Sequence, residues 1–99
     1  MAKARFEWDP AKDQANQRKH GVSFSEAREL LESNVDYLEL YDDTHSAEEE
    51  RFIAIGPIKR GLVVVVWSER SEDTIRLIGA RWATTAERRL FREHMERST

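Results

Sequence analysis

The sequence predicts an α+β fold of one domain, residues 1–99, in which two N-terminal helices and one C-terminal helix pack on a twisted antiparallel β-sheet. Three observations predict this architecture. Residues 62–67 form an unbroken apolar run without alternation, which is typical of a central strand covered on both faces. Turn residues separate this run from two strand-like segments, 51–56 and 74–80, so that residues 51–81 form the central meander of the sheet. Helix-start signals stand before and after the meander.

The first predicted helix spans residues 10–20. Asp9 is the expected N-cap, Pro10 suits the first helical position, and Gly21 ends the segment. The last residues of the helix are basic, so they complement the negative end of the helix dipole. For His20 this position favours a capping role over a catalytic one.

Two capping boxes predict the other helices. Ser23–Glu26 opens a helix over 24–33, and Thr84–Glu87 opens a C-terminal helix that ends near Met95. The apolar residues of the 24–33 segment fall on one stripe, so this helix should lie against the sheet. The remaining strand-like segments are 6–8 and 35–41.

The composition is that of a soluble globular chain, with 39% hydrophobic and 35% charged residues. No run approaches the ~18 apolar residues that a membrane-spanning helix needs, so we expect no membrane contact. The chain has no cysteine, which excludes disulfides and thiolate chemistry. This composition is compatible with the cytoplasm, and we expect a cytoplasmic protein.

The net charge of -3 is unevenly distributed. Residues 32–50 contain eight acidic residues and no basic one, whereas residues 51–99 contain ten basic and six acidic residues. The C-terminal half can therefore present a local positive face, and the acidic segment suits a basic partner.

Arginine recurs at the ends of the predicted meander strands, at positions Arg51, Arg60, Arg70 and Arg81. A guanidinium presents a planar fork that matches phosphate and carboxylate groups. An apolar sheet bordered by such groups indicates anion binding, although each arginine taken singly is equally compatible with ordinary surface charge.

The polar connection after residue 41 contains the only residues that suggest a metal site. Asp42, Asp43 and His45 carry suitable ligand atoms, but their spacing matches no known metal motif. We therefore expect neither a metal ion nor a cofactor.

Segments spread over nearly the whole chain resemble the signature of the BrnT family of toxins. They are, in order, Phe6-Glu7-Trp8-Asp9, Lys12, Asn16, Lys19-His20-Gly21-Val22-Ser23-Phe24, Glu26-Ala27, Asp43, His45-Ser46, Glu49, Arg51, Ile55-Gly56, Ile75-Arg76, Ala80-Arg81, Ala83 and Glu87-Arg88. The segment Lys19–Phe24 is the most distinctive of them. Two positions depart from the family pattern: Trp82 stands where a basic residue is common, and the turn 57–60 is not rich in serine and glycine.

The resemblance implies a RelE-like ribonuclease that is the toxin of a type II toxin–antitoxin pair. It implies RNA as substrate, cleavage without metal, and arrest of translation. It also implies neutralisation by a BrnA antitoxin, a protein with a DNA-binding domain. We therefore expect a hetero-oligomer that meets DNA only through the antitoxin.

Metal-free RNA cleavage needs a base for the 2′-hydroxyl, cations for the pentavalent phosphate and an acid for the leaving oxygen. Arg70 and Arg81 follow directly from strand ends, on rigid scaffold, and are the candidates for the phosphate. Glu69 and His45 are the candidates for the base. Glu69 would have to be partly desolvated to act near pH 7, whereas His45 would need no such shift and could also serve as the acid.

Two function classes fit the sequence. The first is a ribonuclease toxin, and the second is a non-catalytic protein-binding module that acts only through its partner complex. The acidic segment 32–50 fits both classes, because a toxin also needs a surface on which its antitoxin docks.

Overall fold

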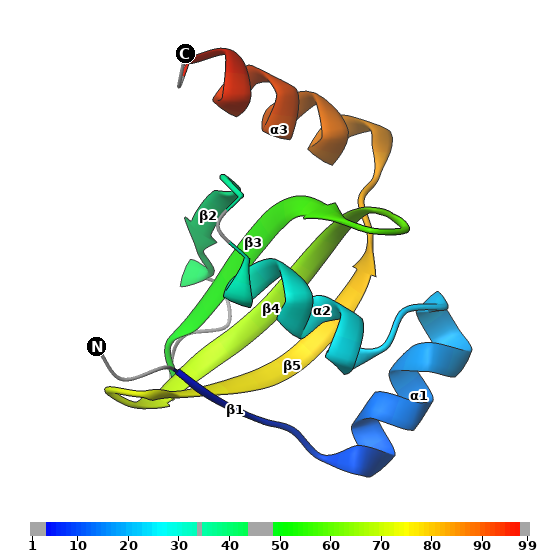
Figure 1. Cartoon of the computed structure of the whole chain (residues 1–99), viewed down its shortest axis with the longest axis vertical. Coiled ribbons are helices and arrows are strands. Elements are labelled where there is room, and N and C mark those ends of the chain that lie inside the picture. Colours follow the sequence, from blue (N-terminus) through cyan, green and yellow to red (C-terminus); the bar gives the residue numbers. More distant parts are fainter. Residues whose placement is uncertain (1–3, 34, 44–48, 98–99) are drawn as a thin grey trace.

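The computed structural model describes residues 4–33, 35–43 and 49–97, which form three helices and five strands (Figure 1). In chain order these are β1 (Arg5–Glu7), α1 (Pro10–His20), α2 (Phe24–Glu32), β2 (Leu38–Tyr41), β3 (Arg51–Ile58), β4 (Gly61–Ser71), β5 (Thr74–Trp82) and α3 (Thr85–Arg97). The α+β class and each predicted element are confirmed. None of the helices in the described ranges has the length and apolar character that crossing a membrane requires.

The five strands form one sheet in the order β1-β5-β4-β3-β2, which places β4 in the middle as predicted. The pairs β2–β3, β3–β4 and β4–β5 are antiparallel. The edge strand β1 differs from the expectation because it pairs with β5 in parallel, with Arg5 opposite Thr74. Its partner lies far along the chain, so no local turn signal fixes its direction.

The main core lies between α2 and one face of the sheet. Phe24, Ala27 and Leu30 of α2 are completely buried. They belong to one cluster with residues of β4 such as Val65 and Trp67. Trp67 is only 3% exposed, so its side chain is part of the core.

Gly56 of β3 shows how closely α2 approaches the sheet. A Cβ added at this position would lie 2.7 Å from a methyl carbon of Leu30 and 2.7 Å from the Cβ of Tyr37. Only glycine fits at this position. The Cβ of Tyr37 is bonded directly to the backbone, so it cannot move away from an added side chain without a shift of the main chain.

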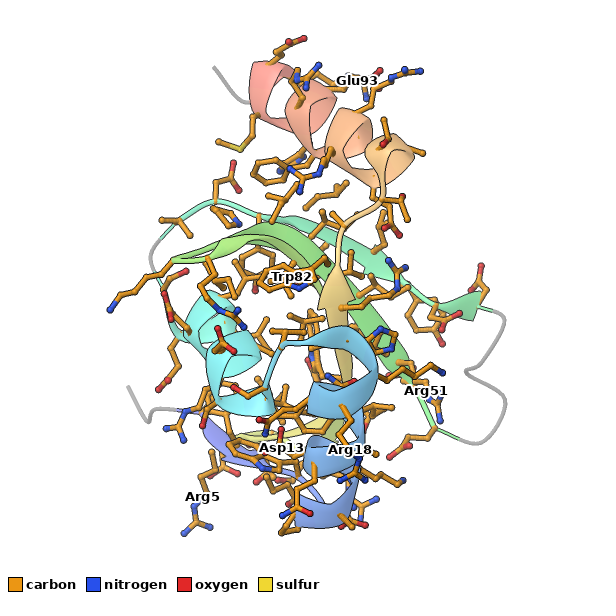
Figure 2. All side chains as sticks on the ribbon, turned by 90° about the vertical axis from the view of Figure 1, so that its right-hand side faces the viewer. Arg5, Asp13, Arg18, Arg51, Trp82 and Glu93 are labelled. Carbon is orange, nitrogen blue, oxygen red and sulfur yellow. The ribbon has the colours of Figure 1, made fainter. Side chains whose placement is uncertain are left out.

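The other face of the sheet, which we call the distal face, points away from α2. Cross-strand neighbours share a face, so the register places on it Arg51, Ile53, Ile55, Val64, Val66, Ser68, Arg76, Gly79 and Arg81. Figure 2 shows Arg51 and α2 on opposite sides of the sheet. Ile55 and Val64 are each only 1% exposed, and α3 contacts the sheet at β3. The apolar run of β4 is therefore covered on both faces, as its lack of alternation predicts.

Helix α1 lies beside the edge of β5 that β1 leaves uncovered (Figures 1 and 2). Asp9 accepts a hydrogen bond from the Ala11 amide, and Gly21 ends the helix at φ 74°, which confirms both predicted caps. The Asn16 side chain donates to the Ala80 carbonyl at 2.8 Å and accepts from the Ala80 amide at 3.3 Å. The Asn16 side chain thus forms, with the amide and carbonyl of Ala80, the two hydrogen bonds that a neighbouring strand would otherwise form.

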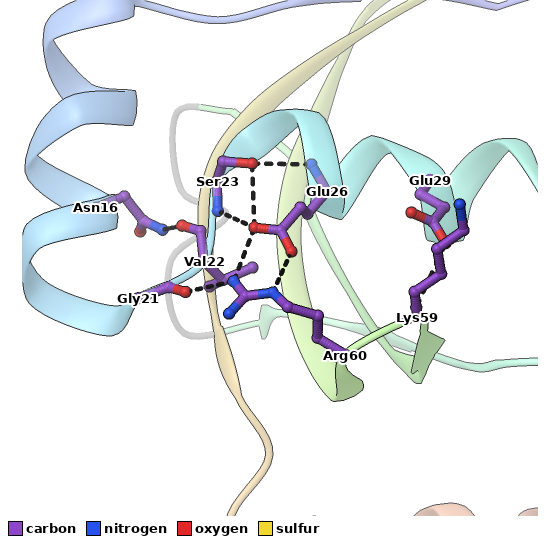
Figure 3. A network of polar contacts seen from close by, with 8 residues as sticks. All are labelled: Asn16, Gly21, Val22, Ser23, Glu26, Glu29, Lys59 and Arg60. Atoms are coloured by element: carbon purple, nitrogen blue, oxygen red, sulfur yellow. Dashed lines mark hydrogen bonds and ion pairs between the residues drawn. The ribbon is translucent and has the colours of Figure 1, made fainter.

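Arg60 in the β3–β4 turn is bound to the start of α2 (Figure 3). The predicted capping box of Ser23 and Glu26 is present, and Arg60 donates to both carboxylate oxygens of Glu26 at 2.7 and 2.9 Å. Its guanidinium also donates to the Gly21 carbonyl and lies over the ring of Trp82, 5.1 Å from the centroid. The hydrogen bonds from Arg60 are the main reason that the pKa of Glu26 falls to about 2. Arg60 is therefore a structural clamp in this fold.

Candidate functional site

Arg81 lies near the end of β5, on the distal face and opposite Val64. Its two terminal nitrogens donate to the two carboxylate oxygens of Glu87, each at 2.7 Å. The Arg81 side chain remains 41% exposed, so its guanidinium reaches solvent while its stem packs on the sheet. The result is a guanidinium fixed near the end of β5 by its pair with an ionised carboxylate.

Glu87 also forms the N-terminal cap of α3. Its Oε1 accepts from the Thr84 amide at 2.9 Å, and its own amide donates to the Thr84 hydroxyl at 3.2 Å. The hydrogen bonds from Arg81 are the largest cause that lowers the pKa of Glu87 to about 2, well under its usual 4.5. One carboxylate therefore fixes both the guanidinium of Arg81 and the start of α3.

Glu69 and Arg70 lie at the other end of the sheet, on β4. Arg70 donates to Oε1 of Glu49 at 3.4 Å, and the buried hydroxyl of Ser68 donates to the same oxygen at 3.0 Å. The Ser68 hydrogen bond, and then that of Arg70, lower the pKa of Glu49 below its usual value. Glu49 is thus an ionised carboxylate between β3 and the end of β4.

Among the described residues, those that line the depression beside this carboxylate are mostly acidic. They are Glu49, Glu50, Glu69 and Arg70. Three carboxylates and one guanidinium give a site that repels a phosphate unless neighbouring cations compensate. The nearest arginines on the distal face are those directly opposite Ser68, at positions 51 and 76.

The two arginines predicted to hold phosphate are far apart. Val64 lies opposite Arg81, and Arg70 follows Val64 by six residues on β4. At ~3.3 Å per residue this separates the two Cα positions by roughly 20 Å. The structure brings Glu69 and Arg70 together at one end of the sheet, and Arg81 stands at the other. His45, the remaining predicted site residue, lies outside the described residues.

Glu49 and Glu87 are partners that the sequence reasoning did not assign. Both occur in the segments that resemble the BrnT family, and Glu87 was recognised only as part of a capping box. Their contacts with Arg70 and Arg81 join residues 21 and 6 positions apart, and only the folded sheet decides which cation meets which carboxylate.

Trp82 points to the face opposite Arg81, because successive strand residues alternate. Its ring packs beside the core and under Arg60, and it approaches the two glycines that flank α1 and β4. A basic residue at position 82 would therefore not join Arg81 on the distal face.

Within the described ranges, no three His, Asp or Glu side chains gather in a way that could hold a metal ion. Of the three residues with suitable ligand atoms, Asp42 and Asp43 are described, and His45 lies outside the described residues.

Comparisons with known proteins agree on one family. Residues 8–87 match the family described as the ribonuclease toxin BrnT of type II toxin–antitoxin systems. The crystal structure of the Brucella abortus ribonuclease toxin BrnT superimposes with a TM-score of 0.61 at 22% sequence identity. That match covers 84% of this chain and 100% of the other, and it shows a shared fold. No curated protein sequence matches significantly. Because the family match spans most of the chain, this protein belongs to the BrnT family of ribonuclease toxins of type II toxin–antitoxin systems.

Proposed function

We propose that this chain cleaves RNA without a metal ion, arrests translation in the cytoplasm, and is neutralised by a BrnA-like antitoxin. The observation that carries the catalytic proposal is the guanidinium of Arg81. It is fixed by two 2.7 Å hydrogen bonds and is still partly exposed on the distal face. A donor held in place before the reaction stabilises a developing phosphorane charge without reorganisation.

Arg81 is proposed to hold the scissile phosphate. Its position is fixed by the two hydrogen bonds to Glu87, whereas Arg70 makes one longer hydrogen bond, of 3.4 Å, to Glu49. Arg70 is proposed to contact a second phosphate of the same strand, since roughly 20 Å separates the two arginines along β4. An RNA strand lying along the distal face would meet both.

The base that takes the 2′-hydroxyl proton must lie within hydrogen-bond reach of the scissile site. Glu69 adjoins Arg70, so it would serve only a phosphate held at that end. It is also exposed, whereas a carboxylate base near pH 7 needs partial desolvation. His45 is the other proposed candidate for the base, and an imidazole could serve as the acid as well.

The family implies an antitoxin protein as partner. Strand β2 forms one edge of the sheet, and its Leu40 and Tyr41 are 40% and 48% exposed. This edge belongs to the acidic segment 32–50. An exposed edge strand with apolar side chains and negative charge suits a basic antitoxin segment that adds to the sheet. DNA would be reached only through that antitoxin.

The test is RNA cleavage by the purified chain, released from its antitoxin, in the presence and absence of a chelator. Equal cleavage with and without EDTA supports a metal-independent ribonuclease. Cleavage that requires added Mg²⁺ would overturn metal independence. No cleavage of free or ribosome-bound RNA, with the antitoxin still binding, would favour the non-catalytic binding module.

A further inference from the structure

A second depression lies between α1 and β5, and its lining is basic. The described residues that line it are Lys12, Ala15, Asn16, Lys19, His20, Ile78 and Gly79. We call this the α1–β5 groove. No carboxylate of the described residues lines it, in contrast to the depression at Glu49, so it attracts a polyanion.

Asn16 sets the orientation of the basic residues. It is bound through its side chain to the backbone of Ala80, which turns this face of α1 toward β5. Lys12 and Lys19 stand four residues before and three residues after Asn16, so they share its helix face. Asp13 is turned elsewhere, because its carboxylate accepts from the Phe24 amide at 2.9 Å. The positive charge on this face of α1 is therefore not neutralised by the acid nearest in sequence.

Gly79 forms the floor of the groove and is an unusual residue for the interior of a strand. A Cβ built on it meets no atom within 4 Å, and its φ is not positive. Neither packing nor backbone conformation therefore requires glycine at this position. The β4–β5 register also shifts beside it, between Val66 and Trp67. A glycine next to a bulge often marks a place where a ligand approaches the backbone closely.

The groove adjoins the proposed phosphate site. Gly79 and Arg81 are two residues apart on β5, so they lie on the same distal face. Lys12 and Lys19 are seven residues apart, or about 10 Å along the helix axis, which allows contacts with different phosphates.

We propose that the α1–β5 groove binds the phosphodiester backbone of single-stranded RNA that flanks the cleavage site. Lys12 and Lys19 contact phosphates, His20 lines the helix end of the path, and Gly79 leaves room for the strand. This inference rests on the proposed ribonuclease function and extends it, because it assigns a binding subsite separate from Arg81.

The test measures binding apart from cleavage. The probe is a fully 2′-O-methylated single-stranded RNA of about 12 nucleotides, within the usual range of single-strand sites. Such RNA has no free 2′-hydroxyl and cannot be cleaved by the proposed route. Affinity is measured at several salt concentrations for the parent, for Lys12→Ala/Lys19→Ala, and for Gly79→Val, which fills the floor.

The matched control is Arg18→Ala/Lys59→Ala, which removes the same charge from exposed positions outside the groove. We expect the groove double variant to bind roughly tenfold more weakly, and its slope of log affinity against log salt to fall by about 1.4, since each lost phosphate contact accounts for ~0.7 with single strands. Gly79→Val should weaken binding without changing the charge. Thermal unfolding of every variant establishes that it is folded.

Equal losses in the groove and control variants would overturn the proposal, because the effect would then be one of net charge. Unchanged RNA binding with loss of antitoxin binding would also overturn it and assign the groove to the protein partner. The ribonuclease proposal is judged separately, on cleavage of unmodified RNA by the parent protein. If the parent protein cleaves RNA and the groove variants bind the probe RNA as tightly as the parent does, the groove proposal is refuted and the ribonuclease proposal stands.

Discussion

Arg81 and Glu87 face each other with two parallel hydrogen bonds of 2.7 Å, and Glu87 at the same time caps α3. This single carboxylate connects the last strand of the sheet to the C-terminal helix. It also holds in place the guanidinium that we propose for the scissile phosphate. We therefore expect stability and activity at this end of the molecule to depend on the same pair.

Glu87→Gln keeps an oxygen that can accept from the Thr84 amide but removes the charge that pairs with Arg81, so we expect it to lower stability by about 1 kcal/mol at pH 7. The pKa of Glu87 is depressed to about 2, chiefly by Arg81, so its contribution is present above its unfolded pKa near 4.5. That contribution is lost as the pH falls toward 2. Denaturant midpoints should therefore differ most between the parent and Glu87→Gln at neutral pH and converge near pH 2.

The control for this measurement is Glu93→Gln, at an exposed position of the same helix. A difference between parent and Glu87→Gln that is as large at pH 2 as at pH 7 would contradict the assignment to the carboxylate charge.

Arg81→Ala is expected to reduce the rate of RNA cleavage by about 10²–10³, the usual cost of one donor to a developing oxyanion. Arg70→Ala should weaken RNA binding more than it slows the bound reaction, because its phosphate is not the one cleaved. Single-turnover kinetics at saturating and limiting protein separate the two effects. Both variants should relieve growth arrest.

An exposed ion pair contributes only ~0–1 kcal/mol to stability. Unfolding midpoints of both variants are therefore measured as well: a loss of activity without a matching loss of stability indicates a catalytic role, and a loss of both together indicates a structural one. Arg28→Ala, which breaks the exposed pair with Glu32, is the matched control. If the rate loss occurs in Arg70→Ala and the binding loss in Arg81→Ala, the scissile phosphate belongs at the Arg70 end.

Val64→Asp is expected to prevent folding. Val64 is 1% exposed in the middle strand, and burial of such a side chain contributes about 1.5–3 kcal/mol. An unpaired buried carboxylate adds a desolvation cost of several kcal/mol, which approaches the ~5–15 kcal/mol that stabilises a typical domain. Circular dichroism and proteolysis provide the readout, with Val35→Asp at a half-exposed site as control. A cooperatively folded Val64→Asp protein would refute the central position of this strand.

The chain should form a tight complex with a cognate antitoxin when the two are expressed together. Leu40→Glu on the exposed edge strand β2 is expected to weaken this complex, because it adds charge where apolar contact and backbone pairing are proposed. Co-purification and native mass spectrometry measure the effect. If Leu40→Glu still forms the complex fully, the antitoxin binds another surface. If the unmodified chain stays free when it is expressed together with the antitoxin, the predicted complex is refuted.

The local sequence determined most of the secondary structure. Asp9, Gly21, Ser23 and Glu26 act through hydrogen bonds and dihedral angles within a few residues, so their signals could be recognised without the fold. The central strand was equally clear, because a run of apolar residues without alternation needs cover on both faces. The resemblance to BrnT toxins was also carried by residues close together in the chain, above all Lys19–Phe24.

The tertiary structure decided how these elements meet. The parallel pairing of β1 with β5 joins residues nearly seventy positions apart and leaves no local signal. The same holds for the arrangement of the charges: Arg70 and Arg81 were both expected directly after strand ends, whereas the strands extend through them and place them at opposite ends of the sheet. A linear sequence fixes which residues carry charge, whereas the distance and facing of two charges depend on strand order, strand direction and the bulges between them. For that reason the candidate residues came from the sequence, and their placement at opposite ends of the sheet came only from the fold.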